Sequence, residues 1–186
     1  MIPDTDPKHA LLQKVATQTE RASNIAGNLL NFSRTGGVTD FTEVDINKLL
    51  DDTLQLLEPQ MRKANVEIIK NYSSVPPKMF GDAGKLQQVF TNLIINARDA
   101  ILDSGEITLA TKYKGENEVV IEVKDTGSGI EDEDLTKIYD PFFTTKEAGR
   151  GFGLAATLGA VRANGGATQY KSSDRVTDLI RSGKLR

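Results

Sequence analysis

The strongest constraint on the fold is a periodic stretch between Lys85 and Leu102. Its apolar residues recur every three or four positions, which is the spacing of one buried face of an α-helix. The other face carries Asn92 and Asn96, one helical turn apart. An asparagine inside a helix costs up to about 0.7 kcal/mol relative to alanine, so the pair indicates either a functional surface or a plain solvated face. The apolar set is Leu86, Val89, Phe90, Leu93, Ala97 and Ile101, and the polar set is Lys85, Gln88, Asn92, Asn96 and Asp99.

The segments around this helix alternate between strand and helix patterns. Asp45 is a plausible N-cap for the first helix, and Pro59 predicts a break or kink within it. Residues Asn164-Gly165-Gly166 predict the end of the last helix. The mixture predicts an α/β (α+β) two-layer sandwich, in which helices cover one face of a sheet. The predicted strands are 41–44, 66–72, 107–113 and 119–124, the last two joined by a hairpin turn at 114–117, and the helices are 46–64, 85–102 and 153–163.

The N-terminal residues 8–34 carry a separate helical pattern with a spacing typical of a coiled coil. One isolated helix cannot bury such a seam, so we expect a partner helix from a second copy of the chain, giving a homodimer, or from another part of the protein. Packing against its own domain is the alternative. The chain therefore divides into an N-terminal helix (1–36), a main domain (37–171) and a polar tail (172–186), where Val176, Leu179 and Ile180 suggest a short helix.

Composition narrows the classes of partner. The 186 residues suit one medium-sized domain with an accessory element. With 26 acidic and 23 basic residues and no basic cluster, the chain is not expected to bind nucleic acid. It has no cysteine, which excludes disulfides and thiolate metal sites. No apolar run is long enough to span a bilayer and no signal peptide precedes the domain, so we expect a cytoplasmic location without a membrane segment.

A glycine-rich turn, Asp125-Thr-Gly-Ser-Gly129, follows the last predicted strand of the hairpin. A carboxylate held at that position can accept a hydrogen bond from an exocyclic amine. The glycines allow backbone angles that other residues avoid and let a flat ring approach the main chain. The turn therefore favours adenine recognition, with a simple strand-ending turn as the alternative.

A second glycine cluster, Gly149-Arg-Gly151-Phe-Gly153, precedes the last predicted helix. Backbone N–H groups and the positive end of a helix suit phosphate oxygens, although a loop that merely leads into a helix is the alternative. The chain has no P-loop sequence. The stretch 151–156, with Asp174 downstream, fits a loose dinucleotide fingerprint, but no buried strand precedes it. Together with Asn92 and Asn96, the two glycine clusters favour ATP with Mg²⁺.

Taken in order, these motifs resemble the ATP-binding catalytic domain of bacterial sensor histidine kinases, which belongs to the Bergerat fold type shared with gyrase, heat-shock chaperone and mismatch-repair ATPases. Residues 20–34 are also similar to the second helix of the dimerisation and phosphoacceptor hairpin of those kinases. The resemblance covers about residues 8–171. Residues 87–100 resemble the N box of the family, 125–129 its first glycine box, 140–143 its F box and 149–154 its second glycine box.

The resemblance implies a role for each matching residue. Asn96 would bind Mg²⁺, Asn92 would act at the phosphate end, and Asp125 would hold the adenine amino group. Phe142 and Phe143 would lie at the base of a lid. The implied nucleotide-binding set is Asn92, Asn96, Asp125, Gly127, Gly129, Ile130, Phe142, Phe143, Thr145, Lys146, Gly149, Gly151, Phe152, Gly153 and Leu154.

Two cations of the lid add candidates that come from the residues themselves. Lys146 and Arg150 carry the sign needed for phosphate contacts, so we take both, with Asn92, as candidate catalytic residues. Solvated lid charges are the alternative for the two cations.

The phosphoacceptor is the main departure from the family pattern. The only histidine, His9, is followed by Ala-Leu-Leu instead of an acidic residue. The resemblance therefore implies a kinase domain that transfers the γ-phosphate of Mg·ATP to a histidine hairpin supplied in trans, with a response regulator downstream.

Two other functions stay open. Hydrolysing clamps of the same superfamily place a glutamate where this chain has Asn92, and an amide cannot accept the proton of water. A non-catalytic nucleotide-binding or helix-pairing module is the third reading.

Overall fold

The computed structural model describes residues 41–114, 118–146, 151–173 and 175–182. The chain divides into two units, Met1–Val38 and Thr39–Arg186, and the description below concerns the second. The predicted N-terminal helix, His9, the hairpin turn at 115–117, Gly149 and Arg150 lie outside the described residues. No described helix combines the length and the apolar character needed to cross a membrane.

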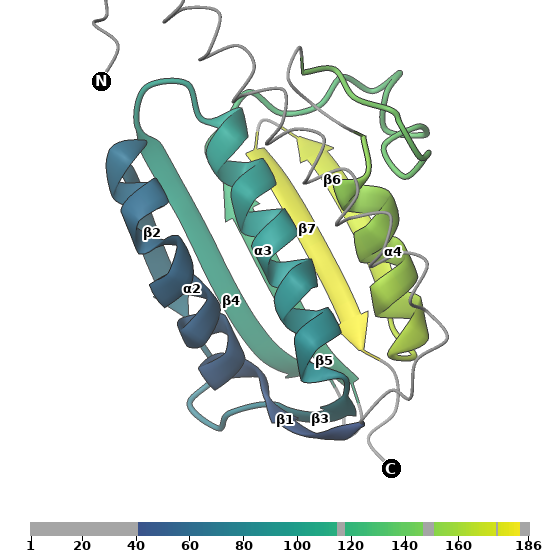
Figure 1. Cartoon of the computed structure of the whole chain (residues 1–186). Coiled ribbons are helices and arrows are strands. Elements are labelled where there is room, and N and C mark those ends of the chain that lie inside the picture. The colour runs from purple at the N-terminus through teal and green to yellow at the C-terminus, as the bar shows by residue number, and fades with distance from the viewer. Residues whose placement is uncertain (1–40, 115–117, 147–150, 174, 183–186) are drawn as a thin grey trace, which may run out of the picture. The chain divides into compact units, whose positions relative to one another are not determined.

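A five-stranded sheet forms one layer, in the order β2-β4-β5-β7-β6, and β1 pairs with β3 in a separate antiparallel ribbon. In the larger sheet β2 and β4 are parallel, and the other neighbours are antiparallel. Figure 1 shows α2, α3 and α4 lying across one face of this sheet, which is the predicted two-layer α/β sandwich. The elements are β1 (Thr42–Asp45), α2 (Ile46–Lys63), β2 (Val66–Asn71), β3 (Lys78–Gly81), α3 (Ala83–Ala100), β4 (Gly105–Lys114), β5 (Glu118–Asp125), α4 (Gly153–Ala163), β6 (Ala167–Ser173) and β7 (Arg175–Ser182).

Aspartate side chains begin the first two helices. Asp45 Oδ1 accepts a hydrogen bond from the Lys48 backbone N–H at 3.0 Å, which confirms the predicted N-cap of α2. Asp82 caps α3 in the same way through the Lys85 N–H. A cap of this kind typically contributes about 1 kcal/mol. α2 continues through Pro59 to Lys63, so the proline does not end the helix.

The core lies between the helices and the sheet. All six apolar positions predicted for α3 are buried, and Ile94, which was not among them, is fully buried as well. They pack against inward-facing residues of the sheet, including Ile107 and Leu109 of β4 and Ile121 of β5. Burying one such side chain stabilises the fold by about 1.5–3 kcal/mol, so this core fixes α3 in place beneath the site described next.

The C-terminal tail differs from its prediction. The prediction of a short helix at Val176, Leu179 and Ile180 is wrong, because residues 175–182 form β7. This strand pairs with β5 on one side and β6 on the other, so it completes the sheet. Two neighbouring strands satisfy its backbone groups, and that tertiary pairing outweighs a helical spacing of three apolar residues.

Candidate functional site

Asp125 ends β5 with a buried side chain, 3% exposed. Its Oδ1 accepts a hydrogen bond from the Gly127 N–H at 2.8 Å. Burial raises the pKa of this carboxyl above its usual value, while the Gly127 hydrogen bond and the positive charge of Lys146 act in the opposite direction. A carboxylate has a second oxygen, which can accept a hydrogen bond from an exocyclic amine.

The turn after Asp125 packs directly on the end of α3. A Cβ atom at Gly127 would lie 2.6 Å from the Ala100 Cβ and 2.7 Å from the Ala100 carbonyl oxygen, so only glycine fits there. The same carbonyl oxygen accepts a hydrogen bond from the Ser128 N–H at 3.0 Å. Gly129 has a φ of 75°, in the left-handed region that favours glycine. These contacts fix the turn against the last residue of α3.

Thr126 fastens the other side of this turn to β4. Its Oγ1 accepts a hydrogen bond from the Glu106 N–H at 3.0 Å, and its own N–H donates to the Glu106 carbonyl oxygen at 3.2 Å. A Cβ at Gly105 would lie 2.4 Å from that Oγ1, so β4 also needs a glycine at this point. Sequence alone does not indicate this role of Thr126, because the role depends on the pairing of β4 with β5.

The start of α4 differs from the starts of α2 and α3. Its N-cap residue is Phe152, and no side chain caps it. An aspartate cap would place a negative charge at this end and oppose an anion, so its absence leaves the positive helix end suited to phosphate oxygens.

The two asparagines of α3 face the start of α4. Asn92 Nδ2 donates a hydrogen bond to the Gly153 carbonyl oxygen at 3.3 Å. A Cβ at Gly153 would lie 3.8 Å from Asn96 Nδ2 and 4.0 Å from Asn96 Oδ1, so the Asn96 amide lies next to the first residue of α4. The plain solvated face is therefore the weaker interpretation of this pair.

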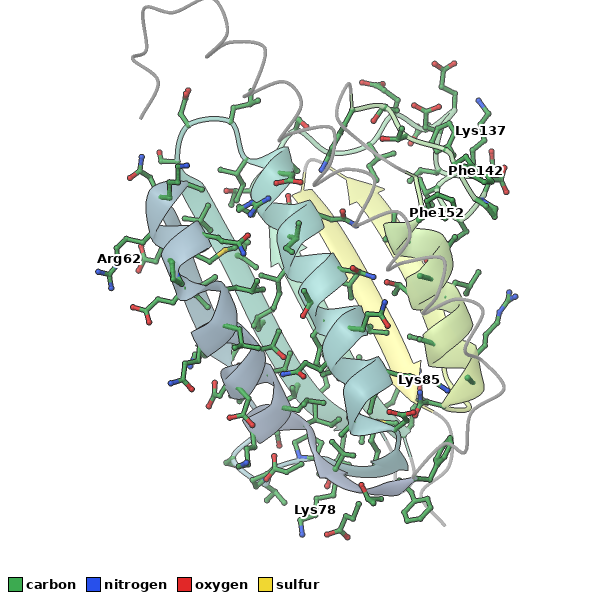
Figure 2. All side chains as sticks on the ribbon, viewed as in Figure 1. Arg62, Lys78, Lys85, Lys137, Phe142 and Phe152 are labelled. Atoms are coloured by element: carbon green, nitrogen blue, oxygen red, sulfur yellow. The ribbon has the colours of Figure 1, made fainter. Side chains whose placement is uncertain are left out.

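Phe142 of the F box and Gly151, just before α4, form a strained contact. Phe142 has a φ of 74°, which is rare for a bulky residue, and its N–H donates to the Gly151 carbonyl oxygen at 2.9 Å. Gly151 has a φ of 64°, and a Cβ there would lie 2.2 Å from the Phe142 carbonyl carbon. The Phe142 and Phe152 rings meet edge to face at 4.4 Å, near the first turn of α4 in Figure 2. Strain of this kind gathers at functional sites.

The side chains of Phe142 and Phe143 differ in their surroundings. Phe142 is 72% exposed despite its ring contact. The Phe143 ring lies 5.9 Å from Lys137 Nζ, and the Phe143 N–H donates to the Asp140 carbonyl oxygen at 3.1 Å. These contacts hold Phe143 against the segment that follows β5.

Lys146 extends back to α3. Its Nζ donates to the Asn96 carbonyl oxygen at 3.4 Å and lies 3.8 Å from Asp99 Oδ2. Partial burial lowers the pKa of this ammonium, while Asp99 and Asp125 raise it and Arg98 lowers it further. A cation therefore lies between the two ends of the site, beside the helix that carries both asparagines.

The structure brings Gly127, Lys146 and Gly153 into contact with α3, the helix that carries Asn92 and Asn96. Ile130 is half-buried, Thr145 is exposed, and Leu154 packs partly against the core. Gly149 and Arg150 are outside the described residues, so their predicted contacts stay predictions.

Comparison with known proteins gives the same assignment as the motifs. Residues 81–182 match the model of the family described as histidine kinase-, DNA gyrase B-, and HSP90-like ATPase. The sensor histidine kinase ZraS of Salmonella typhi is 31% identical over 164 residues, which cover 88% of this chain and 35% of ZraS. The chain thus spans about a third of the length of that relative.

Solved structures agree in fold. The nucleotide-free catalytic domain of the histidine kinase ThkA is 28% identical, with a TM-score of 0.72 over 78% of this chain and 96% of that one. ThkA in complex with the response regulator protein TrrA matches 99% of this chain and 53% of that one, with a TM-score of 0.82 at 24% identity. The chain therefore belongs to the family of histidine kinase-, DNA gyrase B- and HSP90-like ATPases, and its ATP-binding domain is of the sensor histidine kinase type.

Proposed function

We propose that this domain binds Mg·ATP along α3 and transfers its γ-phosphate to a protein histidine. The observation that carries the proposal is the spacing of Asn92, Asn96 and Ala100, each one turn after the last. Asn92 contacts Gly153 at the start of α4, and Ala100 contacts Gly127 beside Asp125. Eight residues of helix span about 12 Å, so the phosphate-binding and base-binding ends would lie at opposite ends of one extended nucleotide.

The base end suits adenine. With Asp125 Oδ1 bound to the Gly127 N–H, the second carboxylate oxygen can accept from the exocyclic amine. A guanine would direct a carbonyl oxygen at the same carboxylate, and two facing acceptors repel. We therefore expect a strong preference for adenine over guanine nucleotides.

Magnesium fits the available donors. Among the described residues, no group of three or more His, Asp or Glu side chains could hold a metal ion by itself. Mg²⁺ commonly uses one or two protein oxygens together with phosphate oxygens and water, so the Asn96 amide oxygen is a sufficient protein ligand. The bound ion would neutralise phosphate charge, while Asn92 would orient the start of α4.

Lys146 would exchange partners when a nucleotide binds. In the structure its ammonium lies beside the Asn96 carbonyl oxygen and Asp99. Phosphate oxygens carry more charge than these acceptors, and Lys146 is close enough to the site to contact them. Arg150 would add a second cation at the same end.

The identity of residue 92 indicates whether the phosphate is transferred to water or to a protein. A hydrolase needs a base that activates water, but the Asn92 amide cannot accept that proton. Transfer to a positioned protein nucleophile needs mainly orientation and charge stabilisation. The acceptor histidine would belong to a hairpin supplied in trans, and a response regulator would receive the phosphate afterwards. The N-terminal helix would pair with a second copy of the chain, and the proposed use of ATP supports a cytoplasmic location.

Incubation with γ-labelled ATP and a separate histidine-bearing hairpin tests this proposal. We expect label on the hairpin that is lost in acid, as a phosphorus–nitrogen bond to histidine requires, and no label with Asn96→Ala. Rapid phosphate release without an acceptor would instead support the hydrolysing clamp. No binding at millimolar ATP would support the non-catalytic module.

A further inference from the structure

Asn164 has a buried side chain, 7% exposed, at the C-cap of α4. Its Oδ1 accepts a hydrogen bond from the Asp82 N–H at 2.9 Å, and its Nδ2 donates to the Ala160 carbonyl oxygen at 2.9 Å. Because Asp82 is the N-cap of α3, this one amide joins the end of α4 to the beginning of α3.

The Asn164 side chain is closely packed against Gly81. A Cβ at Gly81 would lie 2.7 Å from Asn164 Oδ1 and 3.2 Å from Leu86 Cδ1. The amide is therefore held between the last residue of β3 and the first turn of α3. A change at either Asn164 or Gly81 removes or displaces the hydrogen bond that joins α4 to α3.

The other end of α4 is held in the same manner, by the hydrogen bond from Asn92 to the Gly153 carbonyl oxygen. Figure 2 places Phe152 at the start of α4 and Lys85 near the start of α3, at opposite ends of the adjoining pair. The two helices thus run antiparallel, with one asparagine bond at each end of α4.

Apolar packing contributes less to the position of α4 than to that of its neighbours. Only Thr157 and Val161 are fully buried on α4, whereas α2 and α3 each bury six residues. Leu154 and Ala160 of α4 add partly buried contacts with the core, so the two asparagine bonds act together with apolar packing in setting the orientation of the helix.

We propose that Asn164 is a positioning residue for the phosphate end of the site. By fixing the far end of α4 on α3, it sets where the first turn of α4 presents its N–H groups to phosphate oxygens. This inference rests on the proposed ATP site, and it adds a residue about 16 Å along α4 from Gly153 that touches no nucleotide. Asn164 contributes to the binding of phosphates and not to the binding of the base.

The test compares Mg·ATP with adenosine, which lacks phosphates. Dissociation constants for both are measured by titration calorimetry or NMR on wild type, Asn164→Ala and Gly81→Ala. We expect each variant to bind Mg·ATP about tenfold more weakly, with adenosine binding unchanged. Because both changes break the same contact, the double variant should lose little more than either single one.

Asn47→Ala is the matched control. Asn47 also belongs to a polar network between elements: its Nδ2 donates to the Ser73 carbonyl oxygen at 3.2 Å, and its Oδ1 accepts from Thr111 Oγ1 at 2.7 Å. This network joins α2 to β4 and the end of β2, and does not include α3 or α4. Asn47→Ala should lower the melting temperature and leave the ratio of ATP to adenosine affinity intact.

The outcomes separate the two proposals. If wild type binds Mg·ATP but both variants keep the wild-type ratio, or if Asn47→Ala lowers the ratio equally, the role of Asn164 is overturned and the ATP site stands. If wild type does not bind Mg·ATP, the proposed function fails and the positioning role fails with it. Should Asn164→Ala not fold, Gly81→Ala decides, because it leaves the amide present but displaced.

Discussion

The two proposed ends of the candidate site, one for the base and one for the phosphates, are built differently. At the base end, Asp125 is buried and the turn that follows it is fastened to both α3 and β4. At the phosphate end, α4 has no side-chain cap and Phe142 combines a positive φ with high exposure. The base end is therefore preformed, whereas the phosphate end keeps backbone donors and strain that a bound anion can use.

This contrast indicates that the two ends contribute differently to nucleotide binding. A rigid, buried acceptor gives selectivity for the base, because a wrong base leaves it unpaired. A strained, polar end can gain most of its stabilisation when phosphate and metal arrive. Variants at the two ends should consequently differ in whether they affect nucleosides or only phosphorylated nucleotides.

The largest effect is expected from Asn96→Ala. Removing the one protein oxygen proposed for Mg²⁺ should weaken Mg·ATP binding at least roughly a hundredfold, because a bound metal contributes several kcal/mol of charge stabilisation. Calorimetric titration with Mg²⁺ and with a chelator measures it. Gln88→Ala, on the same polar face of α3, is the control and should bind normally. Equal Mg·ATP affinity in Asn96→Ala and wild type would remove Asn96 from the metal site.

Glycine substitutions distinguish the ends directly. Gly127→Ala forces a methyl group into Ala100, so adenosine and Mg·ATP affinities should fall together, by about tenfold or more. Gly151→Ala combines a φ of 64° with a contact of 2.2 Å to Phe142, so it should weaken Mg·ATP and spare adenosine. Both titrations are run on folded protein checked by circular dichroism. If both variants give the same pattern, the site has no separable ends.

Asp125→Asn should increase the stability of the fold at pH 7 and weaken the binding of ATP. The pKa of the buried carboxyl is raised in the folded state, so ionising it costs stability as the pH rises above the ordinary value of 3.8. Below that pH both states are protonated and the cost disappears. The variant should therefore be more stable than wild type at pH 7 and lose this advantage in acid, as urea denaturation at several pH values would measure.

The same substitution should change the pH dependence of binding. Wild-type affinity for ATP should fall in acid as Asp125 gains its proton, whereas Asp125→Asn should bind about tenfold more weakly at pH 7 with a flat profile. Parallel profiles would show that Asp125 is not the group that binds the base.

The smallest effect is expected from Gly159→Ala. Gly159 lies in an exposed part of α4, and a Cβ there meets nothing within 4 Å. Alanine should raise the free energy of unfolding by about 0.5–1 kcal/mol, because it lowers the conformational entropy of the unfolded chain. Chemical denaturation measures it, and Mg·ATP affinity should not change. A loss of stability would mean that α4 has a tighter environment than described.

Local patterns were sufficient to predict much of the fold. The helix at 153–163 was predicted with the bounds found for α4, because glycines precede it and Asn164-Gly165 follows it. The tail was predicted wrongly, and β3 and β6 were not predicted. β3 pairs with β1 and β7 pairs with β5, partners that lie distant in sequence, and β6 is the outer neighbour of β7. Propensity carries no information about such pairing.

The same distinction applies to the site. The motif order alone predicts that Asp125, Asn92 and Asn96 belong to one site. The hydroxyl of Thr126 and the amide of Asn164 could not be assigned from sequence. Each acts through a backbone group of another element, and the sequence marked them only as turn and helix-end residues.

The most direct test of a two-ended Mg·ATP site is the response of backbone amide NMR signals during titration. The Gly127 amide should shift with both adenosine and Mg·ATP, because both carry the base. The Gly153 amide should shift with Mg·ATP alone, because only phosphates reach the start of α4, while Gly165 at the far end of α4 stays nearly unchanged. Absence of shifts at both Gly127 and Gly153 at saturating Mg·ATP, or equal shifts at Gly153 with adenosine, would contradict the account.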